Sequence, residues 1–184
     1  MAHVYAFLAP GLEEVECLAA MDVLVRAGVS VSLVSITDTL EVTGSHQFTI
    51  KADCLMKDVE WEKADVLFLP GGMPGTINLA SCQELTEQLV KGLEAGKRLA
   101  AICAAPSVLG GLGLLKGKKA TCYPGFEEKL LEADSQKAGV VTDGQITTAR
   151  GLGYALDLGL ELVRLLIDEE TSKKIKASIQ YDQF

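Results

Sequence analysis

The sequence has little positive charge. Seventeen Lys and Arg residues stand against 25 Asp and Glu residues, which gives a net charge of −8 and a pI near 4.8. Nucleic acids and anionic membranes are bound through basic surfaces, so we expect neither as a partner. No membrane span is expected either, because Pro10, Gly11 and nearby glutamates interrupt the first apolar run. The first residues lack a basic segment followed by small residues, so they do not predict a signal peptide.

Histidine and paired cysteine are scarce as well. His3 and His46 are the two histidines of the chain. The cysteines are odd in number and lack a C-x-x-C pair, which argues against a disulfide framework or a structural zinc site. This usage favours a reducing cytoplasm. The five cysteines are Cys17, Cys54, Cys82, Cys103 and Cys122.

What the chain does have is the composition of one globular domain over residues 1–184. Hydrophobic residues make up 48% and charged residues 23%, and a chain of this length can bury a large core. Apolar runs of strand length alternate with segments of helical spacing. This alternation predicts an α/β fold, a doubly wound and mostly parallel sheet with helices on both faces.

The expected elements follow from the apolar spacing and from the Gly and Pro residues that end each run. Strands are expected at residues 3–9, 29–36, 65–69, 99–102 and 119–122, and helices at residues 13–27, 83–95, 124–131 and 153–167. A hairpin or a small excursion is expected at residues 40–50, and a hairpin is expected at residues 139–148, around Asp143-Gly144. The residues available for one face of the first helix are Val15, Leu18, Ala19, Val23 and Leu24.

Ligands in such sheets bind beyond the carboxyl ends of the strands. Three segments with suggestive chemistry follow expected strands: Pro10-Gly11 leading to Glu16, Pro70-Gly71-Gly72, and Cys103. We therefore expect these three segments to meet at one edge of the sheet.

Cys103 lies between the expected strand 99–102 and a helix that starts near Pro106. Ala101 and Ala105 flank the sulfur at equal spacing, which resembles a nucleophile elbow whose crowding excludes large neighbours. A thiol at a helix N-terminus is expected to favour thiolate. A buried cysteine that acts as a small hydrophobic residue fits this stretch equally well.

Gly72 and Glu16 have possible roles beside such a nucleophile. The N–H groups of Gly72 and Ala104 would form an oxyanion hole, although Gly71-Gly72 also fits a simple turn after a strand. Burial and a neighbouring thiolate would raise the pKa of Glu16, so that it could donate or exchange a proton. The alternative is that Glu16 only complements the helix N-terminus, which is our interpretation of Glu13 and Glu14.

Other motifs are missing. The Gly110–Gly113 and Gly151–Gly153 stretches lack the spacing of a dinucleotide fingerprint, and Gly111 and Gly117 do not match a P-loop. We expect no cofactor and no metal. Neither histidine follows Cys103 in the sequence, so the chain lacks the usual histidine base of a Cys-His hydrolase. His46 is interpreted as an exposed loop residue that could still reach a neighbouring subunit's site.

Three motifs together resemble a known family. LPGGMPG at residues 69–75, AAICAAP at residues 100–106 and GLEEVE at residues 11–16 resemble the ThiJ/PfpI superfamily, in the branch of the parkinsonism-associated protein deglycase and its bacterial relatives. The similarity extends over nearly the whole chain. It implies a flavodoxin-like sandwich, a single class I glutamine amidotransferase-like domain and a homodimer.

The resemblance also implies site roles. Cys103 would be the oxidation-prone nucleophile, Glu16 the protonated partner of its thiolate, and Gly72 and Ala104 the oxyanion donors. Arg150 matches an arginine that helps to bind anions near the sulfur. His46 falls where close relatives often have an arginine that reaches across the dimer.

Three positions depart from the family pattern. Tyr123 stands where the deglycase branch commonly has a histidine, and Leu152 replaces a proline. Ala104 follows the cysteine, where the protease-like branch has a histidine. Protease activity is therefore not expected, and Tyr123 could supply only a weakly acidic O–H.

The primary hypothesis is a cofactor-independent glyoxalase or deglycase activity on small dicarbonyls such as methylglyoxal. The alternative is a redox-responsive stress protein or chaperone whose Cys103 is oxidised to sulfinate, since an accessible thiolate is both nucleophilic and oxidisable. A third possibility is a scaffold with little catalytic function of its own.

Overall fold

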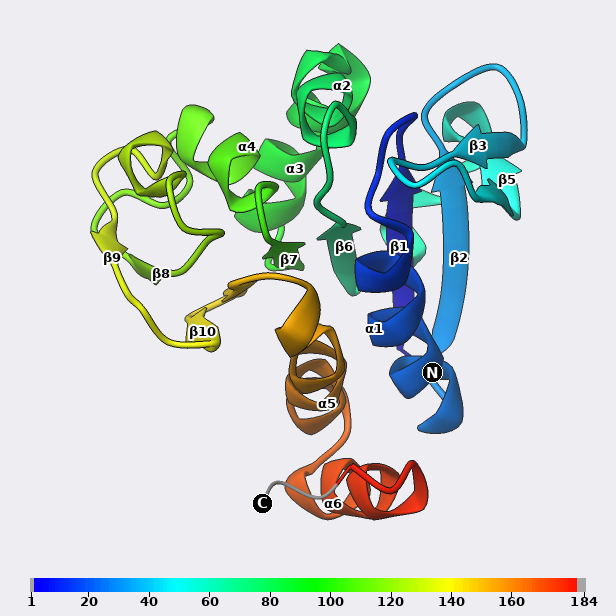
Figure 1. The fold of residues 1–184 in the computed structure, drawn as a ribbon, viewed down its shortest axis with the longest axis vertical. Coiled ribbons are helices and arrows are strands. Elements are labelled where there is room, and N and C mark those ends of the chain that lie inside the picture. The colour runs from blue at the N-terminus through cyan, green and yellow to red at the C-terminus, as the bar shows by residue number, and fades with distance from the viewer. Residues whose placement is uncertain (1, 182–184) are drawn as a thin grey trace.

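The computed structural model describes residues 2–181. Within them, seven strands form the main sheet in the order β10-β11-β7-β6-β1-β2-β5 (Figure 1). The strands β11, β7, β6, β1, β2 and β5 are paired in parallel, and β10 is antiparallel to β11. The strands are β1 (His3–Leu8), β2 (Ser30–Ser35), β5 (Cys54–Leu55), β6 (Val66–Leu69), β7 (Arg98–Ile102), β10 (Val140–Asp143) and β11 (Ile146–Ala149).

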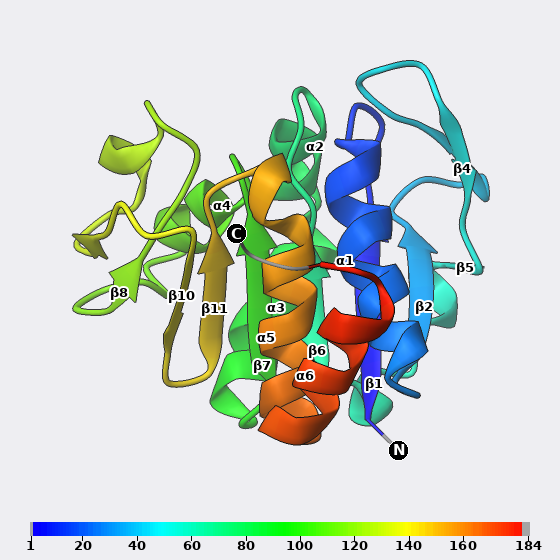
Figure 2. The same ribbon diagram turned by 60° about the horizontal axis from the view of Figure 1, so that its bottom comes forward.

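Helices cover both faces of this sheet, so the predicted α/β architecture is confirmed. In Figure 2, α1 (Glu14–Arg26) and α5 (Ala155–Leu166) lie in front of the strands, with α6 (Glu169–Ser178) outside them. The helices α3 (Gln83–Glu94) and α4 (Pro106–Gly111) lie behind, and α2 (Gly75–Ser81) sits above the strand ends. No helix within residues 2–181 is long and apolar enough to cross a membrane.

Smaller elements complete the chain. The expected hairpin at residues 40–50 is β3 (Glu41–Thr43) paired with β4 (Thr49–Lys51). A short strand β8 (Lys119–Ala120) pairs with β9 (Asp134–Ser135).

Alternation along β1 shows why the sheet is buried on both faces. Val4, Ala6 and Leu8 join the core under α1 and α5, whereas Tyr5, Phe7 and Ala9 join the core under α3 and α4. Side chains of successive strand residues point to opposite faces, so an uninterrupted apolar run supplies two cores at once.

The buried face of α1 differs from the expected one. Val23 and Leu24 are buried as expected, but Val15 and Leu18 are exposed, and Glu14 and Glu16 point inward instead. The apolar spacing alone favoured the outward residues. Burial of the two glutamates is possible because loop N–H groups hydrogen-bond to both carboxylates.

The prediction of a helix at residues 124–131 is also wrong. Only a 3₁₀ turn, Glu127–Lys129, is present there. Gly125 has a φ of +95°, and its N–H donates to the Glu127 carboxylate at 2.7 Å. A left-handed glycine held by a side chain favours a turn over a regular helix.

The topology brings the three expected segments together. The strands β1, β6 and β7 are neighbours, and the chain leaves β1 toward β2 on one side but continues with β6 on the other. Such a reversal of strand order opens a crevice at the carboxyl ends. Glu16, Gly71-Gly72 and Cys103 all follow these three strands.

Candidate active site

Cys103 occupies a sharp turn between β7 and α4. Its φ is +63°, which is uncommon for a residue with a side chain. Its N–H donates to the Ala149 carbonyl at 2.9 Å, and its carbonyl accepts the N–H of Tyr123 at 2.8 Å. Pro106 begins α4, as expected. The main chain thus fixes the turn on both sides and leaves the thiol partly exposed.

Glu16 lies beside this thiol. It is 1% exposed, and its carboxylate accepts the N–H of Gly71 at 3.1 Å and a further N–H from Leu152. A hydrogen bond joins its side chain to that of Cys103. Burial raises the pKa of Glu16 to about 7, the Glu13 charge adds to this rise, and the hydrogen bonds oppose it. The carboxyl group therefore changes its protonation near neutral pH.

The Cys103 thiol has a raised pKa rather than the lowered one expected for a cysteine at a helix N-terminus. Burial and the Glu16 carboxylate raise it to about 12, whereas hydrogen bonds from the N–H groups of Ala104 and Gly72 lower it only in part. The expectation of a thiolate favoured by the helix N-terminus is wrong while Glu16 is ionised, because two negative charges are costly side by side. The thiol can lose its proton more easily when Glu16 accepts it.

Glycines allow this close approach. A Cβ added to Gly71 would lie 2.5 Å from the Glu16 Oε2 and 2.6 Å from the Cys103 Cβ. Gly72 has a φ of +91°, and a Cβ there would collide with the backbone of Leu12 and Glu13. This backbone positions the N–H of Gly72 toward the sulfur, where the N–H of Ala104 also points.

Tyr123 and Arg150, at the edge of the site, make contacts with different segments. The ring of Tyr123 packs against Gly151, and Tyr123 is bound to Cys103 through its main-chain N–H. Arg150 donates to the Lys137 carbonyl at 3.1 Å, and its charge acts on Cys122 and Glu127. These contacts of Arg150 are with the loops beside the site rather than with Cys103.

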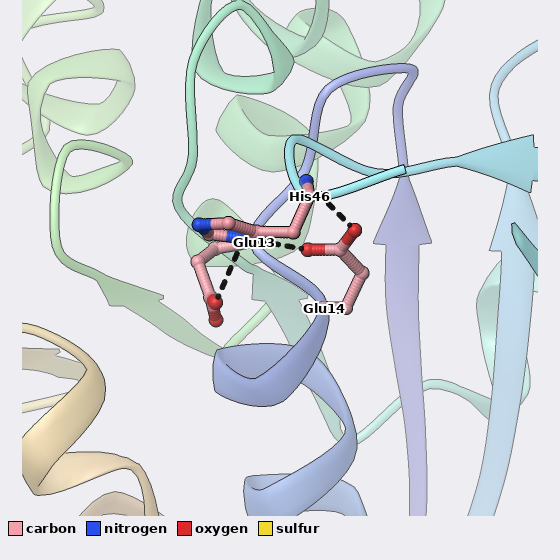
Figure 3. A group of neighbouring side chains, drawn as sticks. All are labelled: Glu13, Glu14 and His46. Carbon is pink, nitrogen blue, oxygen red and sulfur yellow. Dashed lines mark hydrogen bonds and ion pairs between the residues drawn. The ribbon is translucent and has the colours of Figure 1, made fainter. Parts of the chain in front are cut away.

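His46 lies in the turn between β3 and β4, exposed as expected, and faces two glutamates (Figure 3). Its Nδ1 is 3.2 Å from Glu14 Oε2 and 3.6 Å from Glu13 Oε1. Among the described residues these three side chains form one group with metal-ligating atoms, within 4.8 Å of one another. Both carboxylates already hold the backbone: Glu13 accepts the N–H of Glu16, and Glu14 accepts those of His46 and Phe48.

Sequence reasoning missed two features of this site. The first is the N–H of Leu152, which reaches Glu16 from a segment far away in the chain. The second is Glu14, which anchors the β3–β4 turn in addition to lying in the first turn of α1. Contacts of this kind depend on tertiary placement, and nothing in the local sequence signals them.

The other cysteines are free thiols. Cys17 is fully buried, and burial with the charges of Glu13 and Glu16 raises its pKa to about 12. Cys122 is buried in the core on the α3 and α4 side, whereas Cys103 packs against the core on the α1 and α5 side. Cys103 differs from these two buried thiols because it is partly exposed and its side chain is hydrogen-bonded to Glu16.

Comparison with known proteins agrees with this geometry. The DJ-1/PfpI family profile matches residues 2–165. The chain belongs to the DJ-1/PfpI family.

Individual relatives of the family extend the comparison. The oxidised DJ-1 of Toxoplasma gondii has a TM-score of 0.95 and 36% identity, with both chains covered completely. Glutathione-independent glyoxalase DJR-1.2 of Caenorhabditis elegans is 32% identical over 165 residues, 89% of this chain and 87% of the relative.

A further relative is longer than this chain. DJ-1 homolog B of Arabidopsis thaliana is 37% identical over 174 residues, which are 94% of this chain but 40% of that protein. DJ-1 homolog A of the same plant is matched over 42% of its length. The chain thus spans less than half the length of these two relatives.

Proposed function

We propose that the protein is a cofactor-independent, cysteine-dependent glyoxalase or deglycase that acts on small reactive dicarbonyls or their adducts. The observation that carries the proposal is the hydrogen-bonded pair of Glu16 and Cys103, with the N–H groups of Gly72 and Ala104 directed at the sulfur. The glyoxalase name of the Caenorhabditis elegans relative supports it.

The first step is addition of the thiol to the aldehyde. The Glu16 carboxylate takes the thiol proton as the sulfur forms a bond to the aldehyde carbon. The C=O π electrons move to oxygen, where the N–H groups of Gly72 and Ala104 stabilise the charge. Glu16 then returns the proton to this oxygen, which gives a hemithioacetal. A carboxyl group with a pKa near 7 suits both directions of transfer at neutral pH.

The second step moves a proton between the two substrate carbons. The Glu16 carboxylate removes the proton from the former aldehyde carbon, and the C–H electrons form an enediolate with the negative charge on the keto oxygen. Glu16 then delivers this proton to the neighbouring carbon, and the hydroxyl proton on the former aldehyde carbon passes to the former keto oxygen, so that a thioester of a 2-hydroxy acid forms. Water then hydrolyses the thioester, releases the 2-hydroxy acid and restores the thiol. The sum is dicarbonyl plus water to 2-hydroxy acid, and no outside oxidant or reductant is needed.

The remaining parts of the proposal concern assembly and location. The exposed apolar face of α1, with Val15, Leu18 and Val25, supports a homodimer, and the turn that carries His46 extends beside the start of this helix. Arg150 and Tyr123 would contribute to substrate or anion binding at the edge of the site. Free cysteines are consistent with a cytoplasmic location.

The test is lactate formation from methylglyoxal by the purified chain without glutathione. Activity is expected in the wild type and is expected to vanish in Cys103→Ala and in Glu16→Gln, while Cys82→Ala serves as a matched cysteine control. Absence of turnover in the wild type would reject the proposal.

A second candidate function is redox sensing, with Cys103 oxidised to sulfinate and the function lying in a partner or chaperone role. The N–H groups of Gly72 and Ala104 at the sulfur favour it, because they would hydrogen-bond to sulfinate oxygens. The oxidised state named for the Toxoplasma gondii relative is in line with it. Mild peroxide should then add oxygen at Cys103 before the other four cysteines, which peptide mass spectrometry measures. Oxidation spread evenly over all five thiols would contradict it.

A further inference from the structure

Large side chains are exposed on three segments that adjoin the candidate site. Tyr123 is 51% exposed, Leu152 is 49% exposed and Met73 is 44% exposed. Side chains of this size are exposed singly on many proteins, but these three belong to segments that bear directly on the reactive pair.

Main-chain contacts fix each of them next to the site. The N–H of Tyr123 donates to the Cys103 carbonyl, and the N–H of Leu152 donates to the Glu16 carboxylate. The Tyr123 ring lies against Gly151, the residue before Leu152, at 3.3 Å from the position of an added Cβ. Met73 follows Gly72, whose N–H is directed at the sulfur. The Tyr123 ring and the Leu152 side chain are thus exposed on adjoining segments beside the Glu16–Cys103 pair, and we call these two side chains the apolar edge.

The polar and apolar parts of the site are separated. The buried Glu16 carboxyl group lies beside the partly exposed thiol and two N–H groups. These groups match the oxygens and reacting carbons of a dicarbonyl. The edge offers carbon surface and one phenol. A carbon substituent on the keto carbon of the substrate therefore has apolar surface to contact. When that position carries only hydrogen, as in glyoxal, the apolar surface stays hydrated.

Resting on the proposed function, we propose that Tyr123 and Leu152 make the site selective for 2-oxoaldehydes that carry an aryl or branched alkyl group. One methylene more or less in a hydrophobic pocket typically changes kcat/KM by about 10- to 200-fold. We expect phenylglyoxal to exceed methylglyoxal in kcat/KM by about tenfold or more.

The test compares the two substrates in variants of the edge. Mandelate from phenylglyoxal and lactate from methylglyoxal are measured by chromatography for the wild type, Leu152→Ser and Tyr123→Ser. The ratio of the two kcat/KM values is expected to fall about tenfold in each variant. Ile167→Ser is the matched control, because Ile167 is similarly exposed but lies at the end of α5, and its ratio should not change. An unchanged ratio in both edge variants, or equal losses for both substrates, overturns the proposal.

A second measurement does not depend on turnover. The rates of Cys103 alkylation by N-phenylmaleimide and by N-methylmaleimide are measured. Each rate is divided by the rate at which the same maleimide alkylates free glutathione. The phenyl reagent is expected to be favoured by about tenfold in the wild type and not in Leu152→Ser. If the phenyl reagent is favoured but no turnover is found, the glyoxalase proposal is rejected and the apolar edge is retained. If turnover is found but the phenyl reagent is not favoured, the apolar edge alone is rejected.

Discussion

The side chains of Glu16 and Cys103 share a hydrogen bond, although one lies in α1 and the other follows β7. Burial raises the pKa of the carboxyl group to about 7 and that of the thiol to about 12. Both shifts have the same cause, which is the cost of negative charge in a partly dehydrated crevice. The pair therefore holds at least one proton over the physiological range, and its reactivity depends on where that proton resides.

The rate of Cys103 alkylation should report this proton. With iodoacetamide, the rate is expected to rise as the pH passes through about 7 and to level off above it, because the Glu16 carboxylate that accepts the thiol proton forms in this range. Glu16→Gln should lose this step. A wild-type rate that is constant from about pH 5 to pH 9 would contradict the prediction, because it would require a persistent thiolate.

The same carboxyl group should make stability depend on pH. Its pKa is raised on folding from 4.5 to about 7, so the folded state binds a proton that the unfolded state has already lost. Stability contributed by this group is thus complete below pH 4.5 and declines until the pH reaches about 7. The decline corresponds to about 3 kcal/mol as an upper estimate.

Urea unfolding of Glu16→Gln at several pH values measures this decline. The variant should gain stability relative to the wild type as the pH rises from 4.5 to about 7, and the difference should be constant above that range. Glu84→Gln, which replaces an exposed carboxyl group in α3, is the control for the substitution itself. A difference that does not vary with pH would show that Glu16 titrates normally.

The crossing of α1 and α5 should tolerate no added atoms at Gly159. A Cβ there would lie 2.8 Å from the Val23 Cβ and 2.9 Å from the Ala20 carbonyl oxygen. Gly159→Ala is expected to destabilise the fold by about 1 to 3 kcal/mol through overpacking. Gly111→Ala in α4 is the matched control, since nothing lies within 4 Å of its added Cβ. Equal unfolding midpoints for the two variants would refute the close helix contact.

The turn between β3 and β4 should depend on Glu14. Its carboxylate accepts the N–H groups of His46 at 3.0 Å and Phe48 at 3.3 Å. Burial raises its pKa, but these hydrogen bonds outweigh burial and leave the pKa lowered. Glu14→Ala should therefore expose the turn to proteolysis, at a cost of about 1 to 3 kcal/mol for the unsatisfied N–H groups. His46→Ala keeps both main-chain bonds and should be cleaved no faster than the wild type.

Much of the fold could be predicted because its signals are local. The apolar runs at β1 and β6 are buried on both faces, and Gly28 and Gly96, both with positive φ, lie just beyond α1 and α3. The alternation of strands and helices along the chain is enough to predict that Glu16, Gly72 and Cys103 lie at the carboxyl ends of strands.

Other features could not be predicted because they depend on tertiary contacts. Glu14 and Glu16 replace Val15 and Leu18 on the buried face of α1, since N–H groups of distant loops satisfy their carboxylates. The thiol pKa followed burial and the neighbouring charge rather than the helix N-terminus. No helix is predicted at α2 from the sequence, and Gly75, which begins it, lacks a side chain and so allows contact with the backbone at Gly11.

The left-handed backbone at Cys103 has a consequence for protein engineering. A φ of +63° disfavours a residue with a β-carbon, at a cost of about 1 kcal/mol or more. The buried acid beside it also lowers stability at neutral pH. Selection for heat resistance alone would therefore remove the chemistry first, because Cys103→Gly relieves backbone strain and Glu16→Gln removes the cost of burying a charge. A thermostable version of this scaffold needs its gains elsewhere, in the helices that cover the sheet.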